Sequence, residues 1–171
     1  YANLRLIKSL YPDISTIYYY SEGGISDEYE FRHLRNEAAD HFGTLKIADI
    51  RRGTMRDEKL VDSLRKCSEE GVVLMREAYP FLADSKCATF SKPVFTLTDS
   101  GKSDYYSLGG VKISSDELSR SIADAALKML GPDAPSFGST IVRNTVCKMN
   151  SSSLARYGLD RNFKKSDFFK D

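Results

Sequence analysis

The segment from Ile14 to Thr54 constrains the fold of this chain more than any other. It opens with Ile-Ser-Thr-Ile-Tyr-Tyr-Tyr, a β-branched and aromatic run without clear alternation, which is typical of a strand covered on both faces. A turn at Ser21-Glu22-Gly23-Gly24 follows, then a charged helix, a second apolar strand at 45–50 and Arg51-Arg52-Gly53-Thr54. Two strands joined by a helix form a βαβ crossover, so the sequence predicts an α/β fold with a mainly parallel sheet.

The composition fits an ordinary globular domain. With 171 residues, 41% of them hydrophobic, the chain is long enough to form one domain with a real core. A formal net charge of +1 provides no general attraction for nucleic acid or an anionic membrane, and no apolar run is long enough for a transmembrane helix. The chain starts at Tyr1 rather than Met, so we expect a processed form or part of a longer protein.

The candidate metal ligands and thiols are few. Cys67, Cys87 and Cys147 form no Cys-x-x-Cys pair, and His33 and His41 are eight residues apart without a third ligand at metal spacing. We therefore predict no metal site. Reduced, mostly buried thiols favour a reducing compartment, either the cytoplasm or an organelle stroma or matrix.

The helix of the crossover and the helix that follows the second strand have different sequence signals. The former is expected to begin at Ser26 as N-cap and to end at Phe42, with Gly43 as its C′ residue. A long amphipathic helix is expected over 57–79, with one apolar stripe that includes Leu60, Leu64, Cys67, Leu74 and Ala78. Gly71 falls on the same stripe and indicates either a kink or a division into two helices.

The second half of the chain is expected to hold a loop at 80–92, a strand at 93–98 and an extended segment at 105–113. Ser114 and Glu117 form a capping box for a helix that Gly131-Pro132 ends. This helix has an apolar face of Leu118, Ile122, Ala125 and Met129. A further strand is expected at 139–146. The predicted organisation is a Rossmann-like domain over 1–148 and a basic, aromatic tail over 149–171.

In this order, the elements between residues 3 and 146 resemble the second half of an atypical, NmrA-like short-chain dehydrogenase/reductase. Asn3-Leu-Arg-Leu-Ile7 is similar to the helix before the fifth strand of that family, and Ile17-Tyr-Tyr-Tyr-Ser21 to the strand whose serine lies at the active site. Ile47 to Gly53 is similar to the next strand, and Lys112 to Leu118 to the helix start that follows. The resemblance implies a Rossmann-like sheet whose N-terminal part is missing.

The resemblance also shows where the catalytic and cofactor groups of the family would lie. Phe31 and Arg35 occupy the positions of the catalytic tyrosine and lysine, and Phe31 has no proton to donate. Ser21 and Tyr29 are the candidate catalytic residues if the chain is an enzyme, with His33 four residues after Tyr29. NAD(P) would bind only if the glycine fingerprint preceded residue 3, because the acids Asp27 and Glu28 after Gly23-Gly24 repel a phosphate.

The C-terminal tail offers a second kind of candidate site. Aromatic and basic side chains alternate in it, and they could dock in the groove of a protein partner or contact phosphates. The candidate docking residues are Tyr157, Phe163, Lys164, Lys165, Phe168 and Phe169.

Three hypotheses for the function follow from the sequence. The first is a catalytically degenerate reductase-like protein that acts as a binding, assembly or scaffolding subunit with other protein subunits. The second is an active NAD(P)-dependent oxidoreductase that lacks its N-terminal half in this chain. The third is a small nucleic-acid or ribonucleoprotein subunit that uses the basic tail.

Overall fold

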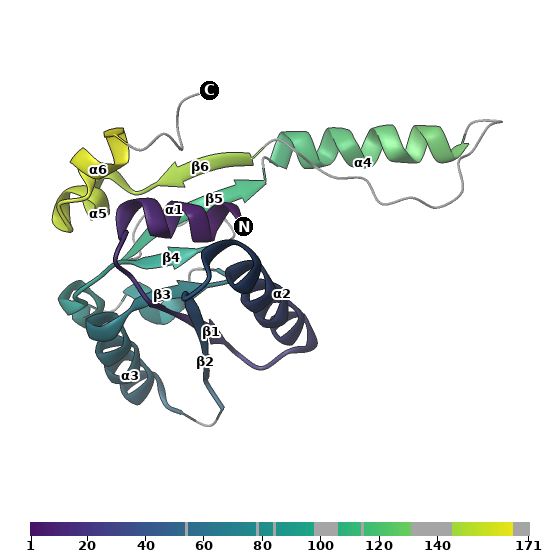
Figure 1. Ribbon diagram of the computed structural model, residues 1–171. Coiled ribbons are helices and arrows are strands. Elements are labelled where there is room, and N and C mark those ends of the chain that lie inside the picture. Colours follow the sequence, from purple (N-terminus) through teal and green to yellow (C-terminus); the bar gives the residue numbers. More distant parts are fainter. Residues whose placement is uncertain are drawn as a thin grey trace.

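A computed structural model describes residues 1–53, 55–77, 79–83, 85–97, 106–113, 115–130 and 145–165. They form an α/β domain with a six-stranded sheet and helices on both faces, as the sequence predicts (Figure 1). The strands are β1 (Thr16–Ser21), β2 (Lys46–Arg51), β3 (Val72–Met75), β4 (Val94–Thr96), β5 (Ser107–Ile113) and β6 (Thr145–Met149). The helices are α1 (Ala2–Leu10), α2 (Ile25–Phe42), α3 (Asp57–Glu70), α4 (Ser115–Leu130), α5 (Ser151–Arg156) and α6 (Asp160–Lys165), with 3₁₀ turns η1 (Pro80–Ala83) and η2 (Ser85–Thr89).

The strand order is β2-β1-β3-β4-β5-β6, and the sheet is Rossmann-like. The first five strands pair in parallel and β6 pairs antiparallel to β5. After β1 the chain adds β2 on one side and then returns to add β3 on the other, so the direction of winding reverses between β1 and β3. The second half of an ordinary Rossmann sheet, in which consecutive strands extend in one direction, has no such reversal.

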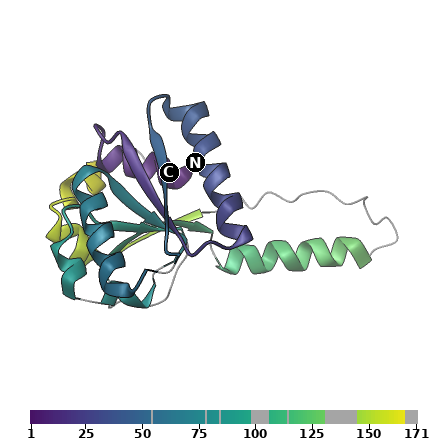
Figure 2. The ribbon, with the colours of Figure 1, turned by 90° about the horizontal axis from the view of Figure 1, so that it is seen from below.

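Two hydrophobic cores lie on opposite faces of the sheet. On one face, α1, α2 and the α5–α6 segment cover Ile17, Tyr19 and Leu74; on the other, α3 and the 3₁₀ turns cover Tyr20, Val73 and Met75 (Figure 2). Neighbouring residues of one strand therefore belong to different cores, because successive side chains of a strand point to opposite faces. This explains the lack of hydrophobic alternation in β1.

The helix predicted over 57–79 is wrong in its second half. Helix α3 ends at Glu70, and Val72–Met75 form the buried central strand β3. Gly71 marks the boundary, where an added Cβ would lie 2.5 Å from the backbone oxygen of Thr16. Only glycine lets the chain pass this close to β1 on its way into the sheet.

The remaining elements follow the predictions in outline. The loop predicted at 80–92 contains the 3₁₀ turns η1 and η2, and the strand and extended segment that follow correspond to β4 and β5. The predicted capping-box helix is α4, although Ser114 lies outside the described residues. Of the strand predicted at 139–146, residues 139–144 also lie outside them, and β6 runs from Thr145 to Met149.

The predicted tail begins as folded structure. Asn150 caps α5 through its side-chain oxygen, which accepts a hydrogen bond from the Ser153 amide at 3.1 Å. Tyr157 and Phe163 are partly buried against the core that α1 covers, so both rings contribute to the packing of this domain. Phe168 and Phe169 lie outside the described residues, as do the side chains of Lys164 and Lys165. None of the helices in the described part of the chain is long and apolar enough to cross a membrane.

Candidate functional site

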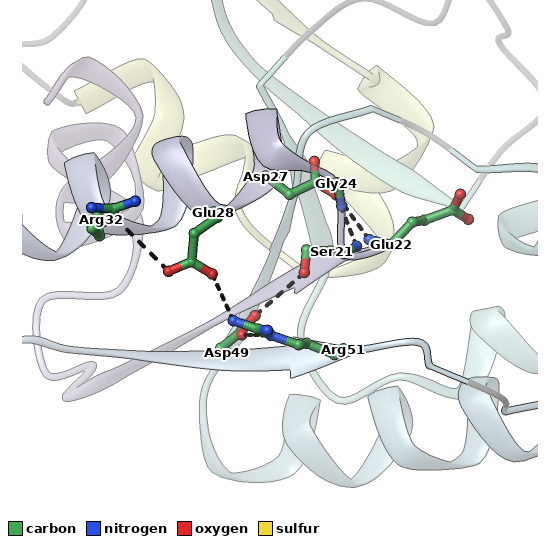
Figure 3. A network of polar contacts seen from close by, with 9 residues as sticks. Ser21, Glu22, Gly24, Asp27, Glu28, Arg32, Asp49 and Arg51 are labelled. Atoms are coloured by element: carbon green, nitrogen blue, oxygen red, sulfur yellow. Dashed lines mark hydrogen bonds and ion pairs between the residues drawn. The ribbon is translucent and has the colours of Figure 1, made fainter.

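The carboxyl ends of β1, β2 and β3 form the candidate site. In open α/β sheets, ligands bind outside the carboxyl ends of the strands at the point where the winding reverses, here between β1 and β3. Ser21 ends β1, Arg51 ends β2 and Arg76 follows β3 directly. The residues drawn in Figure 3 come from the end of β1 and the loop after it, the first half of α2 and the end of β2.

The loop between β1 and α2 is held by one carboxylate. Oδ2 of Asp27, a buried residue in the first turn of α2, accepts hydrogen bonds from the amides of Glu22 at 3.1 Å, Gly23 at 3.1 Å and Gly24 at 3.3 Å. Gly23 has a φ of +96°, a conformation that suits glycine and helps to turn these amides toward a single acceptor. Helix N-termini with converging amides commonly bind anions. Here an internal carboxylate occupies that position.

This arrangement corrects the predicted helix start. The N-cap of α2 is Gly24 rather than Ser26, because the Asp27 carboxylate reaches back to the Gly24 amide as in a capping box. The sequence predicts that the acids after Gly23-Gly24 repel a phosphate. The geometry adds that Asp27 itself uses the amides with which a phosphate would interact.

An ion-pair network extends from α2 to the end of β2. Arg51 donates from Nε to Oδ2 of Asp49 at 2.5 Å and from Nη2 to Oε2 of Glu28 at 2.7 Å, and Glu28 lies 3.9 Å from Nε of Arg32 (Figure 3). The hydrogen bond to Asp49, together with the charges of Asp49 and Glu28, raises the pKa of the Arg51 guanidinium. Because the Arg51 and Glu28 side chains are exposed, their ion pair orients Arg51 more than it stabilises the fold.

A second network lies at the reversal itself. The Arg76 guanidinium is 3.9 Å from Oδ1 of Asp27 and 3.6 Å from Oε1 of Glu30. Glu30 also accepts a hydrogen bond of 2.6 Å from the buried Tyr19 hydroxyl. Burial and this hydrogen bond raise the pKa of Tyr19, so its hydroxyl stays protonated and serves as a donor to Glu30.

A hollow of about 300 Å³ opens beside this second network. It lies between the N-terminal end of α1, the middle of α2 and the ends of β4 and β5, and its volume is at the lower limit for small-molecule pockets. Glu30, His33, Asn3 and the nearly buried Lys112 are among its polar lining residues. This pocket could not be predicted from the sequence, because its residues come from distant segments.

The two predicted catalytic residues are in very different surroundings. Ser21 is buried at the end of β1, where its hydroxyl donates to Oδ1 of Asp49 at 3.5 Å, at the upper limit for a hydrogen bond. The side chain of Tyr29 is 71% exposed on α2. Ser21 thus belongs to the polar network at the carboxyl edge, whereas Tyr29 is directed to solvent.

Phe31 and Arg35, which align with the catalytic pair of the reductases, form a packing unit. The Phe31 ring stacks on Tyr19 with a centroid distance of 6.3 Å, and the Arg35 guanidinium lies 5.8 Å from the centroid of Phe31. This cation–π stack covers the buried Tyr19 side chain on the α2 side of the sheet. A side chain without a hydroxyl suits this apolar position.

Metal and thiol chemistry find little support in the described residues. Among them, no cluster of three or more His, Cys, Asp or Glu side chains could hold a metal ion. Cys87 is buried, while Cys67 and Cys147 are partly buried. Burial raises the pKa of Cys67, and that of Cys147 to about 11, so both thiols are protonated at neutral pH and are poor nucleophiles.

Comparisons with known proteins identify the fold alone. No protein-family model matches the chain, and no curated protein matches it. A crystal structure of a conserved domain protein from Vibrio cholerae O1 biovar El Tor strain N16961 is similar, with a TM-score of 0.62 and 14% sequence identity. The similarity covers 96% of this chain but 57% of the Vibrio chain. The present chain therefore spans little more than half the length of that protein.

Proposed function

We propose that this chain is a non-catalytic binding domain of a larger assembly, with its recognition site at the carboxyl ends of β1, β2 and β3. The observation that carries the proposal is the reversal of winding between β1 and β3, because open α/β sheets bind ligands outside the strand ends at such a reversal. Charged side chains gather at this position from three elements: Asp27 and Glu30 from α2, Asp49 and Arg51 from β2, and Arg76 after β3.

The charges at the edge indicate the kind of ligand. Carboxylates and guanidinium groups alternate there, and the amides of the loop after β1 already donate to Asp27. Such a surface favours a polar ligand that both donates and accepts hydrogen bonds, and it disfavours a phosphate or dinucleotide. Binding would exchange some of the Arg51 and Arg76 ion pairs for contacts with the ligand, at low cost for the exposed pair of Arg51 with Glu28.

The oxidoreductase alternative has less support. Its two candidate residues, Ser21 and Tyr29, differ in burial and direction, and Phe31 is part of a packing stack. Descent from the short-chain reductases stays a separate proposal, which the binding role does not require. The nucleic-acid alternative loses two of its tail aromatics, Tyr157 and Phe163, to the packing of the domain.

The proposal is tested by NMR titration of the isotopically labelled protein with compound mixtures sorted by charge: amines, carboxylates, zwitterions, neutral polyols and nucleotides. We expect ligands from the polar, non-phosphate mixtures to shift the amide signals of 21–28, 49–52 and 76–77. Arg76→Gln should weaken binding by about tenfold, the loss of one charge-assisted hydrogen bond. Arg65→Gln is the matched control, because Arg65 pairs with Glu69 on the outer surface of α3.

NADPH distinguishes the alternatives. A dinucleotide at a hundred times its dissociation constant would stabilise the fold by about 2.7 kcal/mol, which is easily seen as a thermal shift. We expect no such shift. Stabilisation by NADPH together with its oxidation in the presence of a carbonyl substrate would overturn the binding-domain proposal in favour of an oxidoreductase.

A further inference from the structure

Helix α4 projects from the domain as an arm. Figures 1 and 2 show, from two directions, that it leaves the body at the end of β5 and runs away from the sheet. Leu118 is 41% exposed and Ile122 is 61% exposed. Among the α4 side chains that the structure describes, none is buried, although the helix is 16 residues long.

Three apolar residues of α4 share one face. Leu118, Ile122 and Ala125 lie within about 60° of one another around the axis, at 100° per residue. Arg120 and Asp124 lie about 160° from Ile122 on either side, so the charges occupy the opposite face. An isolated helix of this length is only marginally stable in water, and amphipathic helices are mainly stabilised by packing of the apolar face. The α4 face is therefore suited to contact another surface.

A second copy of the chain is a poor occupant for this face. A helix of 16 residues is about 24 Å long and about 10 Å wide, so its contact footprint is roughly 240 Å². Stable interfaces between separate molecules bury about 800 Å² on each partner. A pair of α4 helices from two free molecules falls well short of this area.

A covalently linked domain does not face the same limit. Linkage raises the effective concentration to the millimolar range, so a small apolar contact is sufficient. The Vibrio protein supplies an independent indication, because its similarity to this chain covers 96% of this chain but 57% of its own length. The unmatched 4% of this chain is shorter than α4, so at least part of the helix has a counterpart in a protein that is considerably longer.

We propose that the α4 face, defined by Leu118, Ile122 and Ala125, docks on a second domain of the same polypeptide that is encoded outside residues 1–171. The inference is independent of any ligand at the carboxyl edge. It concerns how the domain is joined to its neighbour, and it holds whether or not the edge binds a small molecule.

Hydrogen–deuterium exchange of the complete gene product and of the 171-residue chain tests the proposal. In the 171-residue chain, the α4 amides should exchange rapidly at every protein concentration. In the complete protein they should exchange at least tenfold more slowly. Ile122→Asp should restore rapid exchange in the complete protein, whereas Leu127→Asp should not. Leu127 is a matched control because it is 69% exposed and lies about 140° from Ile122 around the axis.

The stability of the short chain is the second measurement. Because α4 has no buried contact among its described side chains, Ile122→Asp should leave the melting temperature of the 171-residue chain unchanged. Three results would overturn the proposal. The first is an equal exchange rate of the α4 amides in the two proteins. The second is protection of these amides in the 171-residue chain that rises with protein concentration, which would identify a second copy as the partner. The third is an equal effect of Ile122→Asp and Leu127→Asp on exchange in the complete protein.

Discussion

Replacing Asp27 by alanine removes the acceptor of three amide hydrogen bonds and a negative charge at the start of α2. We expect this change to destabilise the domain more than any other single substitution of an acidic residue at the carboxyl edge. Asp27→Asn keeps the shape and one acceptor oxygen but removes the charge, so the pair of variants separates hydrogen bonding from electrostatics.

The magnitude follows from the contacts. Loss of a capping side chain costs about 1 kcal/mol, and loss of a favourable charge at a helix N-terminus costs about 0.3–1 kcal/mol. The amides of Glu22 and Gly23 in the loop before α2 also lose a charged acceptor, although water replaces this acceptor in part. We expect about 2–3 kcal/mol for Asp27→Ala and about 1 kcal/mol for Asp27→Asn. At about 2–4 °C per kcal/mol for a domain of this size, Asp27→Ala should melt about 5–10 °C lower.

Urea denaturation followed by circular dichroism measures the free energy of unfolding directly. Glu28→Ala is the matched control, since Glu28 lies in the same turn but makes only exposed ion pairs with Arg32 and Arg51. It should cost less than about 1 kcal/mol. Excess sulfate should stabilise Asp27→Ala, whose amides become available to an anion, more than the wild type. An Asp27→Ala variant as stable as the wild type, or an equal effect of sulfate on both, would refute the reasoning.

Three further predictions concern the frame around the site. Gly71→Ala should destabilise the domain by about 1–3 kcal/mol in urea denaturation, because the added Cβ would lie 2.5 Å from the backbone oxygen of Thr16. Asn3→Ala should cost about 1–3 kcal/mol in the same assay, since its amide pairs with both the oxygen and the nitrogen of Val111, at 2.7 and 2.8 Å. Burial raises the pKa of Tyr20 to about 12, so its stabilising contribution is complete below about pH 10 and is lost as the pH rises toward 12. Absorbance at the phenolate band should show Tyr20 ionising together with unfolding.

Two of these predictions have a simple comparison variant. Gly24→Ala, at an ordinary φ of −77° and with the added Cβ 3.9 Å from the nearest atom, should cost about 1 kcal/mol or less, because neither the backbone nor a neighbour opposes it. A Gly71→Ala variant no less stable than Gly24→Ala would contradict the close approach at β3. Tyr20→Phe should remove one phenolate from the alkaline transition, and an unchanged transition would show that Tyr20 does not take part in it.

The fold class was predictable because β1, α2 and β2 follow one another with clear boundaries. The central strand β3 was not, because a four-residue strand covered on both faces has no periodicity of its own. Its Leu74 also continued the helical stripe of α3 by coincidence. Without β3 the sequence could not indicate the reversal of winding, and so it could not locate the candidate site.

The site itself was predictable only in part. The position of Ser21 at the end of a strand and the acids after Gly23-Gly24 were visible in the sequence. The role of Asp27 as an internal acceptor required knowledge of the loop conformation, in particular the positive φ of Gly23. Arg76 reaches Glu30 and Asp27 only because β3 lies beside β1, and no local pattern encodes that contact.

The pairing of Asn3 with Val111 joins the first helix to a strand 108 residues later. Ribosomes add about 5–20 residues per second, so α1 leaves the ribosome at least several seconds before the strand that receives it. During this interval its apolar residues Leu4, Leu6, Ile7 and Leu10, all buried in the finished domain, have no β5 to pack near. Until about 111 residues have emerged from the ribosomal exit tunnel, the nascent chain should therefore depend on chaperones. The domain completes its core only near the end of its synthesis.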